Sequence, residues 1–144
     1  MARVAEILAA KGGAVHSTGP ETSAYDAIAR MVEKSVGSVL VTEGGAIAGI
    51  FTERDYLRRV LLKDLDPRTT RVRDVMTPRI VCVEPTRSLE DCMSIMTQQR
   101  FRHLPVVVDG RVAGVISIGD LVKYLSAERE VELRYLTEYI TGRT

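Results

Sequence analysis

Gly49-Ile50-Phe51-Thr52-Glu53-Arg54-Asp55 is the stretch that decides the fold, because the chain repeats it as Gly114-Val115-Ile116-Ser117-Ile118-Gly119-Asp120. In each copy, a glycine followed by two large apolar residues is typical of the end of a buried strand. A hydroxyl residue three positions before an aspartate, followed by an amphipathic run, is typical of the start of a helix. The hydroxyl and the carboxylate are therefore expected at a strand-to-helix corner, where unpaired backbone N–H groups favour an anion.

Both corners also have the spacing of a capping box. In such a box, Thr52 and Asp55, or Ser117 and Asp120, would satisfy the free N–H groups at the start of a helix. A capping role explains the hydroxyl and the acid in either copy. It does not require the preceding glycine, nor an aspartate in both copies where glutamate is the better cap. We therefore expect the corners to cap their helices and, in addition, to bind a ligand.

The composition indicates one compact globular protein, or one built as two small halves, because 45% of its 144 residues are hydrophobic. With 20 basic and 19 acidic residues, the formal net charge of +1 creates no field that would attract nucleic acid or a membrane. The apolar runs are too short to span a bilayer, and the N-terminal residues do not resemble a signal peptide. Two cysteines, Cys82 and Cys92, do not make a disulfide framework. We expect a cytoplasmic protein with free thiols and without membrane or nucleic-acid partners.

The repeat extends well beyond these two stretches. When each residue is paired with the one 65 positions later, identical residues recur from Pro20 and Pro85 to Asp55 and Asp120. Such self-similarity predicts one supersecondary unit used twice. Each copy is expected to form a β-α-β-β-α unit, in which two helices cover a three-stranded sheet. The expected strands are residues 14–17, 38–42 and 46–51 in the first copy and residues 80–83, 104–108 and 112–116 in the second.

The helices follow from caps and apolar spacing. Ser23 and Ser88 are expected to cap the first helix of each copy, and the closing helices are expected at residues 53–62 and from near Ile118 onward. An apolar stripe between Val131 and Ile140 extends the last helix. Because one small sheet cannot bury both of its faces, the two copies are expected to pack on each other. The predicted domains are residues 1–66, residues 67–126 and a helical tail at residues 127–144.

The doubled unit closely resembles a pair of CBS (cystathionine β-synthase) domains. The resemblance rests on the two corner stretches, which close the hairpins, and on Arg102-His103-Leu104-Pro105-Val106-Val107, which opens the second hairpin. It covers roughly Val4 to Ser126 and leaves no room for an attached enzyme. It implies an α/β (α+β) fold in which two β-α-β-β-α repeats pack as a pseudo-two-fold pair, followed by an extended C-terminal helix. It also implies two clefts between the repeats that bind adenosyl ligands, where the aspartate holds the ribose hydroxyls and the threonine or serine lies beside ribose and phosphate.

The resemblance assigns residues to each cleft by their position in the motif. The first cleft would consist of the corner residues Ile50, Thr52 and Asp55, the adenine wall Arg79, Ile80 and Val81, and the phosphate contacts Arg100, Arg102 and His103. The second cleft would consist of the corner residues Val115, Ser117 and Asp120, the adenine wall Ala14, Val15 and His16, and the phosphate end Gly37, Ser38 and Arg54. Because Gly37 and Ser38 replace Arg102 and His103, the second cleft has less positive charge, and we expect the two sites to differ in affinity or in preferred phosphate count.

The function that the resemblance implies is a non-enzymatic sensor of adenine nucleotides. AMP is the favoured ligand, ADP, ATP, NAD and S-adenosylmethionine stay open, and the sequence calls for no metal. Ligand entry would change the arrangement of the two copies, or of two subunits, and so the activity of an unidentified partner protein. CBS pairs usually associate into disc-like dimers through their helices. This habit and the apolar stripe of the tail together predict a homodimer.

Two alternatives to this sensor stay open, namely a ligand-independent interaction or assembly module and an NAD-binding CBS pair. A rise in melting temperature with AMP, ATP or NAD would separate binding from its absence. An enzyme is not expected, because Cys82 and Cys92 lie where small core residues are typical and no group is placed to orient a base beside them.

Overall fold

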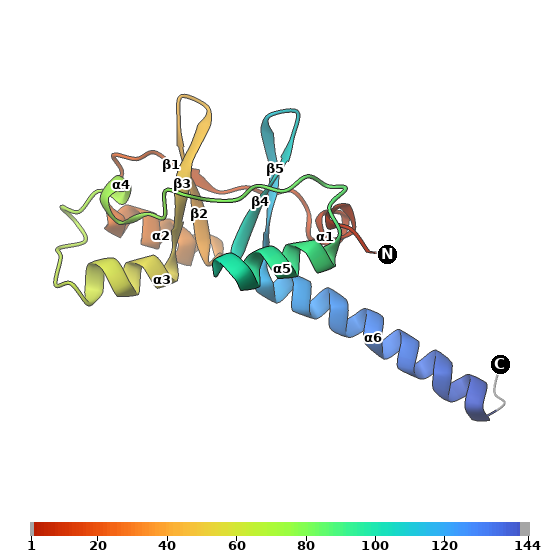
Figure 1. The fold of residues 1–144 in the computed structure, drawn as a ribbon. Coiled ribbons are helices and arrows are strands. Elements are labelled where there is room, and N and C mark those ends of the chain that lie inside the picture. Colours follow the sequence, from red (N-terminus) through yellow and green to blue (C-terminus); the bar gives the residue numbers. More distant parts are fainter. Residues whose placement is uncertain (1, 142–144) are drawn as a thin grey trace. The chain divides into compact units, whose positions relative to one another are not determined.

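The computed structural model describes residues 2–141, without the side chains at positions 128, 131, 132, 135, 136 and 138–141. The chain divides into two compact units, whose elements are labelled in Figure 1. Residues 14–81 form a continuous unit, and residues 1–13 join the chain from Cys82 onward in a split unit. The units therefore differ from the predicted domains 1–66 and 67–126. Residues 1–13 belong with the second copy of the repeat, and residues 67–81 belong with the first.

The continuous unit contains the expected three-stranded sheet. Its strands are β1 (Ser17–Thr18), β2 (Ser38–Glu43) and β3 (Ala46–Thr52), in that order. β1 runs parallel to β2, and β2 and β3 form an antiparallel hairpin. The predicted strand 14–17 is thus shorter and lies slightly later, although the carbonyl of His16 still accepts a hydrogen bond from the N–H of Leu40 at 2.9 Å.

Helices cover this sheet and supply its core. They are α2 (Ala24–Lys34), the short α3 (Glu53–Asp55), the π-helix η1 (Tyr56–Leu61) and α4 (Val72–Val75). Ser23 caps α2 as expected, because its hydroxyl accepts a hydrogen bond from the N–H of Asp26 at 3.1 Å. The predicted helix 53–62 forms as α3 and η1, which changes from α to π hydrogen bonding at Tyr56. Met31, Phe51 and Val60 are fully buried where α2, β3 and η1 pack together.

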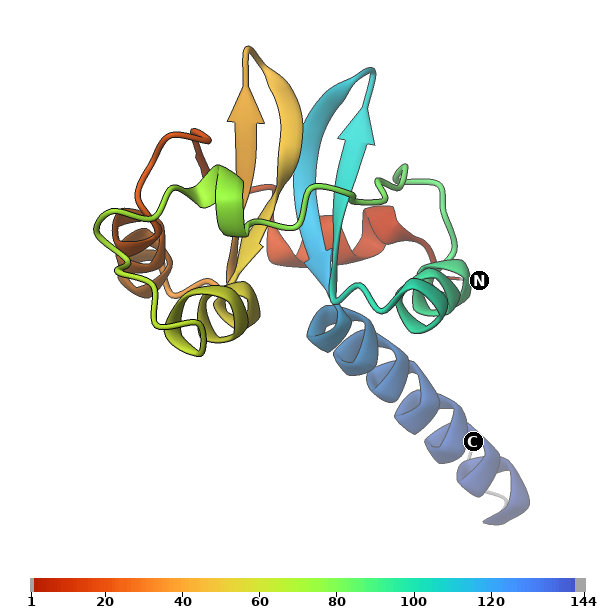
Figure 2. The ribbon, with the colours of Figure 1, turned by 60° about the vertical axis from the view of Figure 1, so that its left-hand side comes forward.

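The split unit repeats this plan with one strand fewer. Its elements are α1 (Val4–Lys11), α5 (Leu89–Gln99), β4 (His103–Val108), β5 (Arg111–Ser117) and α6 (Ile118–Thr141), shown from a second side in Figure 2. β4 and β5 form an antiparallel hairpin whose register shifts between Val106 and Val107. The hairpin of β2 and β3 shifts at the equivalent place, between Val41 and Thr42. The two copies of the repeat therefore share the position of the register shift in their hairpins.

The predicted strand at residues 80–83 was wrong. Only Val83 pairs, in a single parallel bridge to Val106, and β4 and β5 alone form the sheet of the split unit. The physical reason is that this segment joins the two units. Thr77 is hydrogen-bonded to Ile50 in the continuous unit, and Val83 is hydrogen-bonded to Pro105 in the split unit. The residues between Thr77 and Val83 connect the two units, so that only Val83 pairs with a strand of the split unit.

Residues 2–13 are held in the split unit by backbone hydrogen bonds. The N–H of Val4 donates to the carbonyl of Arg87 at 2.9 Å, and the N–H of Leu89 donates to the carbonyl of Ala2 at 3.1 Å. The hydroxyl of Tyr124 on α6 is hydrogen-bonded to Glu6 on α1. α1 is therefore attached both to the loop before α5 and to the first turns of α6.

The last helix confirms the expected extended C-terminal helix, since α6 continues to Thr141. The apolar stripe of Val131, Tyr135, Leu136, Tyr139 and Ile140 lies outside the described side chains. Within residues 2–141, no helix combines the length and the apolar character needed to cross a membrane.

Candidate functional site

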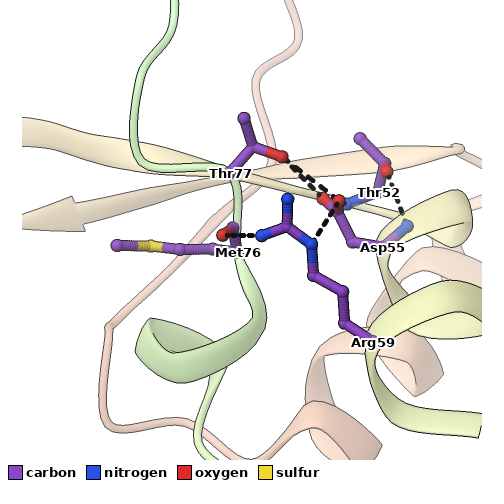
Figure 3. A network of polar contacts seen from close by, with 5 residues as sticks. All are labelled: Thr52, Asp55, Arg59, Met76 and Thr77. Carbon is purple, nitrogen blue, oxygen red and sulfur yellow. Dashed lines mark hydrogen bonds and ion pairs between the residues drawn. The ribbon is translucent and has the colours of Figure 1, made fainter. Parts of the chain in front are cut away.

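Both strand-to-helix corners form the predicted capping boxes. In the continuous unit, the N–H of Thr52 donates to Asp55 Oδ2 at 3.0 Å, and the N–H of Asp55 donates to Thr52 Oγ1 at 3.1 Å (Figure 3). In the split unit, the N–H of Ser117 donates to Asp120 Oδ2 at 2.8 Å, and the N–H of Asp120 donates to Ser117 Oγ at 3.1 Å. In each unit, two reciprocal hydrogen bonds thus hold a carboxylate at the first turn of a helix.

The carboxylate of Asp55 is nearly enclosed by protein groups. Its side chain is only 11% exposed. The hydroxyl of Thr77 lies 3.1 Å from Oδ1 and 3.4 Å from Oδ2, and Arg59 Nε lies 3.9 Å from Oδ1. Arg59 also donates to the carbonyl of Met76 at 2.7 Å, so that its guanidinium joins η1 to the segment around Thr77 (Figure 3). Both oxygens of Asp55 are therefore in contact with protein donors.

The carboxylate of Asp120 is more open. Its side chain is 25% exposed, and Lys11 Nζ lies 2.7 Å from Oδ2. Lys11 Nζ also donates to the carbonyl of Val115 at 2.8 Å. Burial opposes ionisation of Asp120, but the hydrogen bonds from Lys11 and Ser117 and the charge of Lys11 outweigh it and hold the pKa of Asp120 below its usual value. The second corner thus presents an ionised carboxylate beside an ammonium group.

The glycine that precedes each corner is required by packing. A Cβ at Gly49 would lie 2.5 Å from the carbonyl oxygen of Thr77 and 2.9 Å from Met76 Sδ. A Cβ at Gly114 would lie 2.6 Å from Leu8 Cδ2. Each glycine therefore lets the segment that opens a repeat approach the strand closely. The glycine, which capping left unexplained, needs no ligand to account for it.

The other residues predicted for the ligand site are distributed over both units. In the continuous unit, Ser38 pairs with Thr52 across the hairpin, Arg54 is an exposed residue of α3, and Ile80, Val81, Val15 and His16 are partly buried. In the split unit, His103 pairs with Ser117 across the hairpin, the carbonyl of Arg102 accepts from the N–H of Ile118 at 2.9 Å, and Arg100 ends α5. The predicted grouping of Asp55 with Arg100, Arg102 and His103, and of Asp120 with Val15, His16, Ser38 and Arg54, joins residues of different units and stays a prediction.

Three residues that contact the carboxylates were not predicted, namely Lys11, Arg59 and Thr77. One signal was available for Lys11. When the apolar turn ending at Leu8 is aligned with the one ending at Met76, a cation follows three residues later in both copies, as Lys11 and Arg79. No pattern indicated Arg59 or Thr77, because their contacts depend on how residues 67–81 return to the first copy.

Cysteine and metal chemistry is not assembled in the part of the chain that the structure describes. No three His, Cys, Asp or Glu side chains lie together there as metal ligands. Cys92 is buried, and burial raises the pKa of its thiol to about 11. Cys82 is exposed, so the prediction of a core residue was wrong there, but partial burial still raises the pKa of its thiol. Both thiols are therefore protonated near neutral pH and poor nucleophiles.

Comparison with known proteins gives consistent matches. The CBS domain model matches residues 13–62 and residues 72–127. The CBS domain-containing protein CBSX3, mitochondrial, of Arabidopsis thaliana is 38% identical over 127 residues, which are 85% of this chain and 62% of that protein. The chain thus spans less than two thirds of this relative's length.

Solved structures show the same fold. A protein with CBS domains from Burkholderia ambifaria MC40-6 is 46% identical, with a TM-score of 0.84, over 88% of this chain and 95% of that one. A hexameric CBS-CP12 protein from bloom-forming cyanobacteria is 28% identical, with a TM-score of 0.76, over 85% of this chain and 70% of that one. The similarity extends over both copies of the repeat.

Proposed function

Because the chain belongs to the CBS domain family, we propose that it is a non-enzymatic regulatory module that binds adenine nucleotides at its two strand-to-helix corners. The observation that carries this proposal is that an aspartate occupies the same capped corner in both repeats. An ionised carboxylate accepts two hydrogen bonds from the vicinal hydroxyls of a ribose. The lowered pKa of Asp120 keeps its carboxylate in this accepting form near neutral pH.

AMP is the proposed ligand, with ADP, ATP, NAD and S-adenosylmethionine as competitors. The positive end of the helix dipole at the start of each closing helix favours an anion such as a phosphate. Arg54, which the resemblance assigns to the phosphate end of the second cleft, is an exposed cation on α3. The nucleotide would act on a partner protein by binding one arrangement of the module better than another, since a ligand without such a difference in affinity changes nothing.

The test is calorimetric titration of the whole chain with AMP, ADP, ATP, NAD and S-adenosylmethionine, alongside Asp55→Asn and Asp120→Asn. Asparagine retains an oxygen for the capping hydrogen bonds but lacks the charge. We expect each variant to lose one of the sites, and Asp74→Asn, an exposed acid of α4, to bind like the wild type. A ligand at about a hundredfold above its Kd should also stabilise the protein by about 2.7 kcal/mol. No heat and no thermal stabilisation with any of the five ligands would refute the proposal.

The second candidate is a ligand-independent assembly module, and one observation favours it. The capping boxes, the contacts of Thr77 and Lys11, and the packing of both glycines all give the corner residues structural roles without a ligand. The same titration separates the candidates. A ligand-independent module would assemble with its partner in the absence of nucleotide, and it would give no heat of binding with any of the five ligands. Nucleotide recovered unchanged after incubation with the protein would support the absence of catalysis.

We also propose that the protein forms a homodimer through its helices and its C-terminal tail. Val32 on α2 and Leu57 and Leu61 on η1 expose 74%, 50% and 54% of their surface. Large apolar side chains on helices are typical of protein contacts, and the cyanobacterial relative is described as hexameric. Sedimentation equilibrium should give a dimer for the wild type and a monomer for Val32→Glu combined with Leu61→Glu.

Cys82 and Cys92 form no disulfide, which suits a reducing compartment such as the cytoplasm.

A further inference from the structure

The two carboxylates, although placed alike, differ in which of their oxygens are occupied. At Asp55, the hydroxyl of Thr77 lies 3.1 Å from Oδ1 and the N–H of Thr52 donates to Oδ2 at 3.0 Å, so that both oxygens have protein donors. At Asp120, both protein donors converge on Oδ2, namely Lys11 Nζ at 2.7 Å and the N–H of Ser117 at 2.8 Å. Among the described residues, no hydrogen bond is formed with Oδ1 of Asp120.

Lys11 is itself held in place. Its ammonium group donates to Asp120 Oδ2 and to the backbone carbonyl of Val115 at 2.8 Å. The second bond ties it to β5, which directly precedes the corner, while its backbone belongs to α1. An ammonium with two such anchors restrains the rotation of the Asp120 carboxylate more than one hydrogen bond would. The capping N–H of Ser117 restrains the same oxygen, so that the other oxygen is left as the acceptor.

We propose that Lys11 is a positioning residue, which orients the carboxylate of Asp120 and leaves Oδ1 open for the hydroxyls of a ribose. This inference rests on the proposed function and adds to it a ranking of the two corners by their affinity for nucleotide. The Asp120 corner binds nucleotide without rearrangement, whereas at Asp55 a ribose must first displace the hydroxyl of Thr77. Asp120 is therefore the tighter of the two sites. Lys11 acts through the carboxylate and need not touch the ligand.

The acidity of Asp120 gives a readout that a purely structural lysine would not affect. Among the described residues, the charge that lowers the pKa of Asp120 belongs to Lys11. The other described titratable or charged side chains on the elements of the split unit are Glu6 on α1, His103 on β4, Arg111 on β5, Glu90, Asp91 and Cys92 on α5, and Lys123, Tyr124, Arg129, Glu130 and Arg134 on α6. Without Lys11, burial acts unopposed by a cation and raises the pKa of Asp120. Binding at this corner should then be lost at a higher pH.

The experiment is calorimetry with AMP in the Asp55→Asn background, which leaves the Asp120 corner as the site under study. Lys11→Met should weaken binding about threefold to tenfold near neutral pH, the effect of ordering a side chain on binding. On acidification, the affinity of the Lys11→Met variant for AMP should also begin to fall at a higher pH than the affinity of its parent. The comparison is made between variants, so that titration of the AMP phosphate affects both alike. Lys11→Arg should restore most of the affinity and the original pH profile.

Lys34→Met is the matched control, because the side chain of Lys34 is 45% exposed and that of Lys11 is 42% exposed. It should bind like its parent. If Lys11→Met does not fold, Lys11→Gln takes its place, since glutamine keeps a donor but not the charge. Affinity and pH profile unchanged by Lys11→Met, or an arginine variant as weak as the methionine one, would overturn the inference alone.

The parent proteins separate this inference from the proposed function. If the wild type binds AMP but Asp55→Asn does not, the Asp120 corner is not a site and the inference fails while the proposed function stands. If the wild type binds none of the adenine nucleotides, the proposed function fails and the inference with it. Tighter binding at Asp55 than at Asp120, measured with the two single variants, would overturn the proposed order.

Discussion

Gly49→Ala should destabilise the protein markedly, whereas Gly114→Ala, at the equivalent place in the repeat, should do so much less. A Cβ at Gly49 would lie 2.5 Å from the carbonyl oxygen of Thr77, and a Cβ at Gly114 would lie 2.6 Å from Leu8 Cδ2. The distances are almost equal, but the obstacles differ. One is a backbone carbonyl held in a bridge, and the other is the end of a flexible side chain.

The magnitude follows from what each obstacle must give up. Two hydrogen bonds join Ile50 and Thr77, at 3.0 and 2.8 Å, and both lengthen if the carbonyl retreats from a new methyl group. The hydroxyl of Thr77, which binds Asp55, moves with them. Three hydrogen bonds at about 1 kcal/mol each, less the about 0.4–1 kcal/mol by which alanine favours folding because it lowers the entropy of the unfolded chain, leave a loss of about 2 kcal/mol. At Gly114, a change of the Leu8 rotamer limits the loss to about 1 kcal/mol or less.

Urea titration followed by circular dichroism measures both losses. Gly19→Ala is the control, because the nearest atom to its Cβ would be 3.9 Å away and its stability should stay the same or rise slightly. Equal destabilisation by Gly49→Ala and Gly114→Ala would refute the reasoning, since it would mean that the nature of the obstacle does not matter. A Gly49→Ala variant as stable as the wild type would show that residues 76 and 77 can move without loss.

Three further predictions follow from the contacts at the corners and from the core. Thr77→Val removes a donor to Asp55, and should lower the free energy of unfolding by about 1 kcal/mol while tightening AMP binding at Asp55; urea titration and calorimetry measure the two effects, and weaker binding would contradict the second. Because the pKa of folded Asp120 is lowered, the stabilisation by its pair with Lys11 is complete above the usual aspartate pKa and is lost as the pH falls through the lowered value. The melting temperature of Lys11→Met should therefore fall less between about pH 6 and pH 3 than that of the wild type, and parallel curves would contradict this. Burial raises the pKa of the Cys92 thiol to about 11, so a thiol reagent at about pH 8 should label it only as fast as the protein opens; rapid labelling of the native protein, seen by peptide mass spectrometry, would contradict this.

Local pattern predicted those features that depend on neighbouring residues. The hairpins over residues 43–45 and over Asp109 and Gly110 formed as expected, and so did the caps at Ser23 and Ser88. The capping boxes of both corners were also predicted, because their geometry is completed within four residues. In each case the residues that make the contact lie close together in the sequence.

Contacts between segments that lie far apart in the sequence could not be predicted in the same way. An apolar turn such as residues 4–11 does not indicate which copy of the repeat it will pack on, and the close approach of Leu8 to Gly114 decides this only in the folded state. The sequence marks Lys11 only as a cation that recurs after the apolar turn, and neither Lys11 nor Thr77 can be assigned to Asp120 or Asp55 until residues 2–13 and 67–81 are placed. The apolar run at residues 80–83 has the composition of a strand, but its two ends are attached to different units.

During synthesis, α1 leaves the ribosome long before the hairpin against which it packs. Residues 14–81 form their unit from one uninterrupted piece of chain, so this unit can fold while later residues are still being added. Leu8 and Lys11 must wait until Gly114 and Asp120 have been made. Translation thus separates the maturation of the two units in time, and a nascent chain that stops before β5 carries an unmatched apolar helix for chaperones to bind.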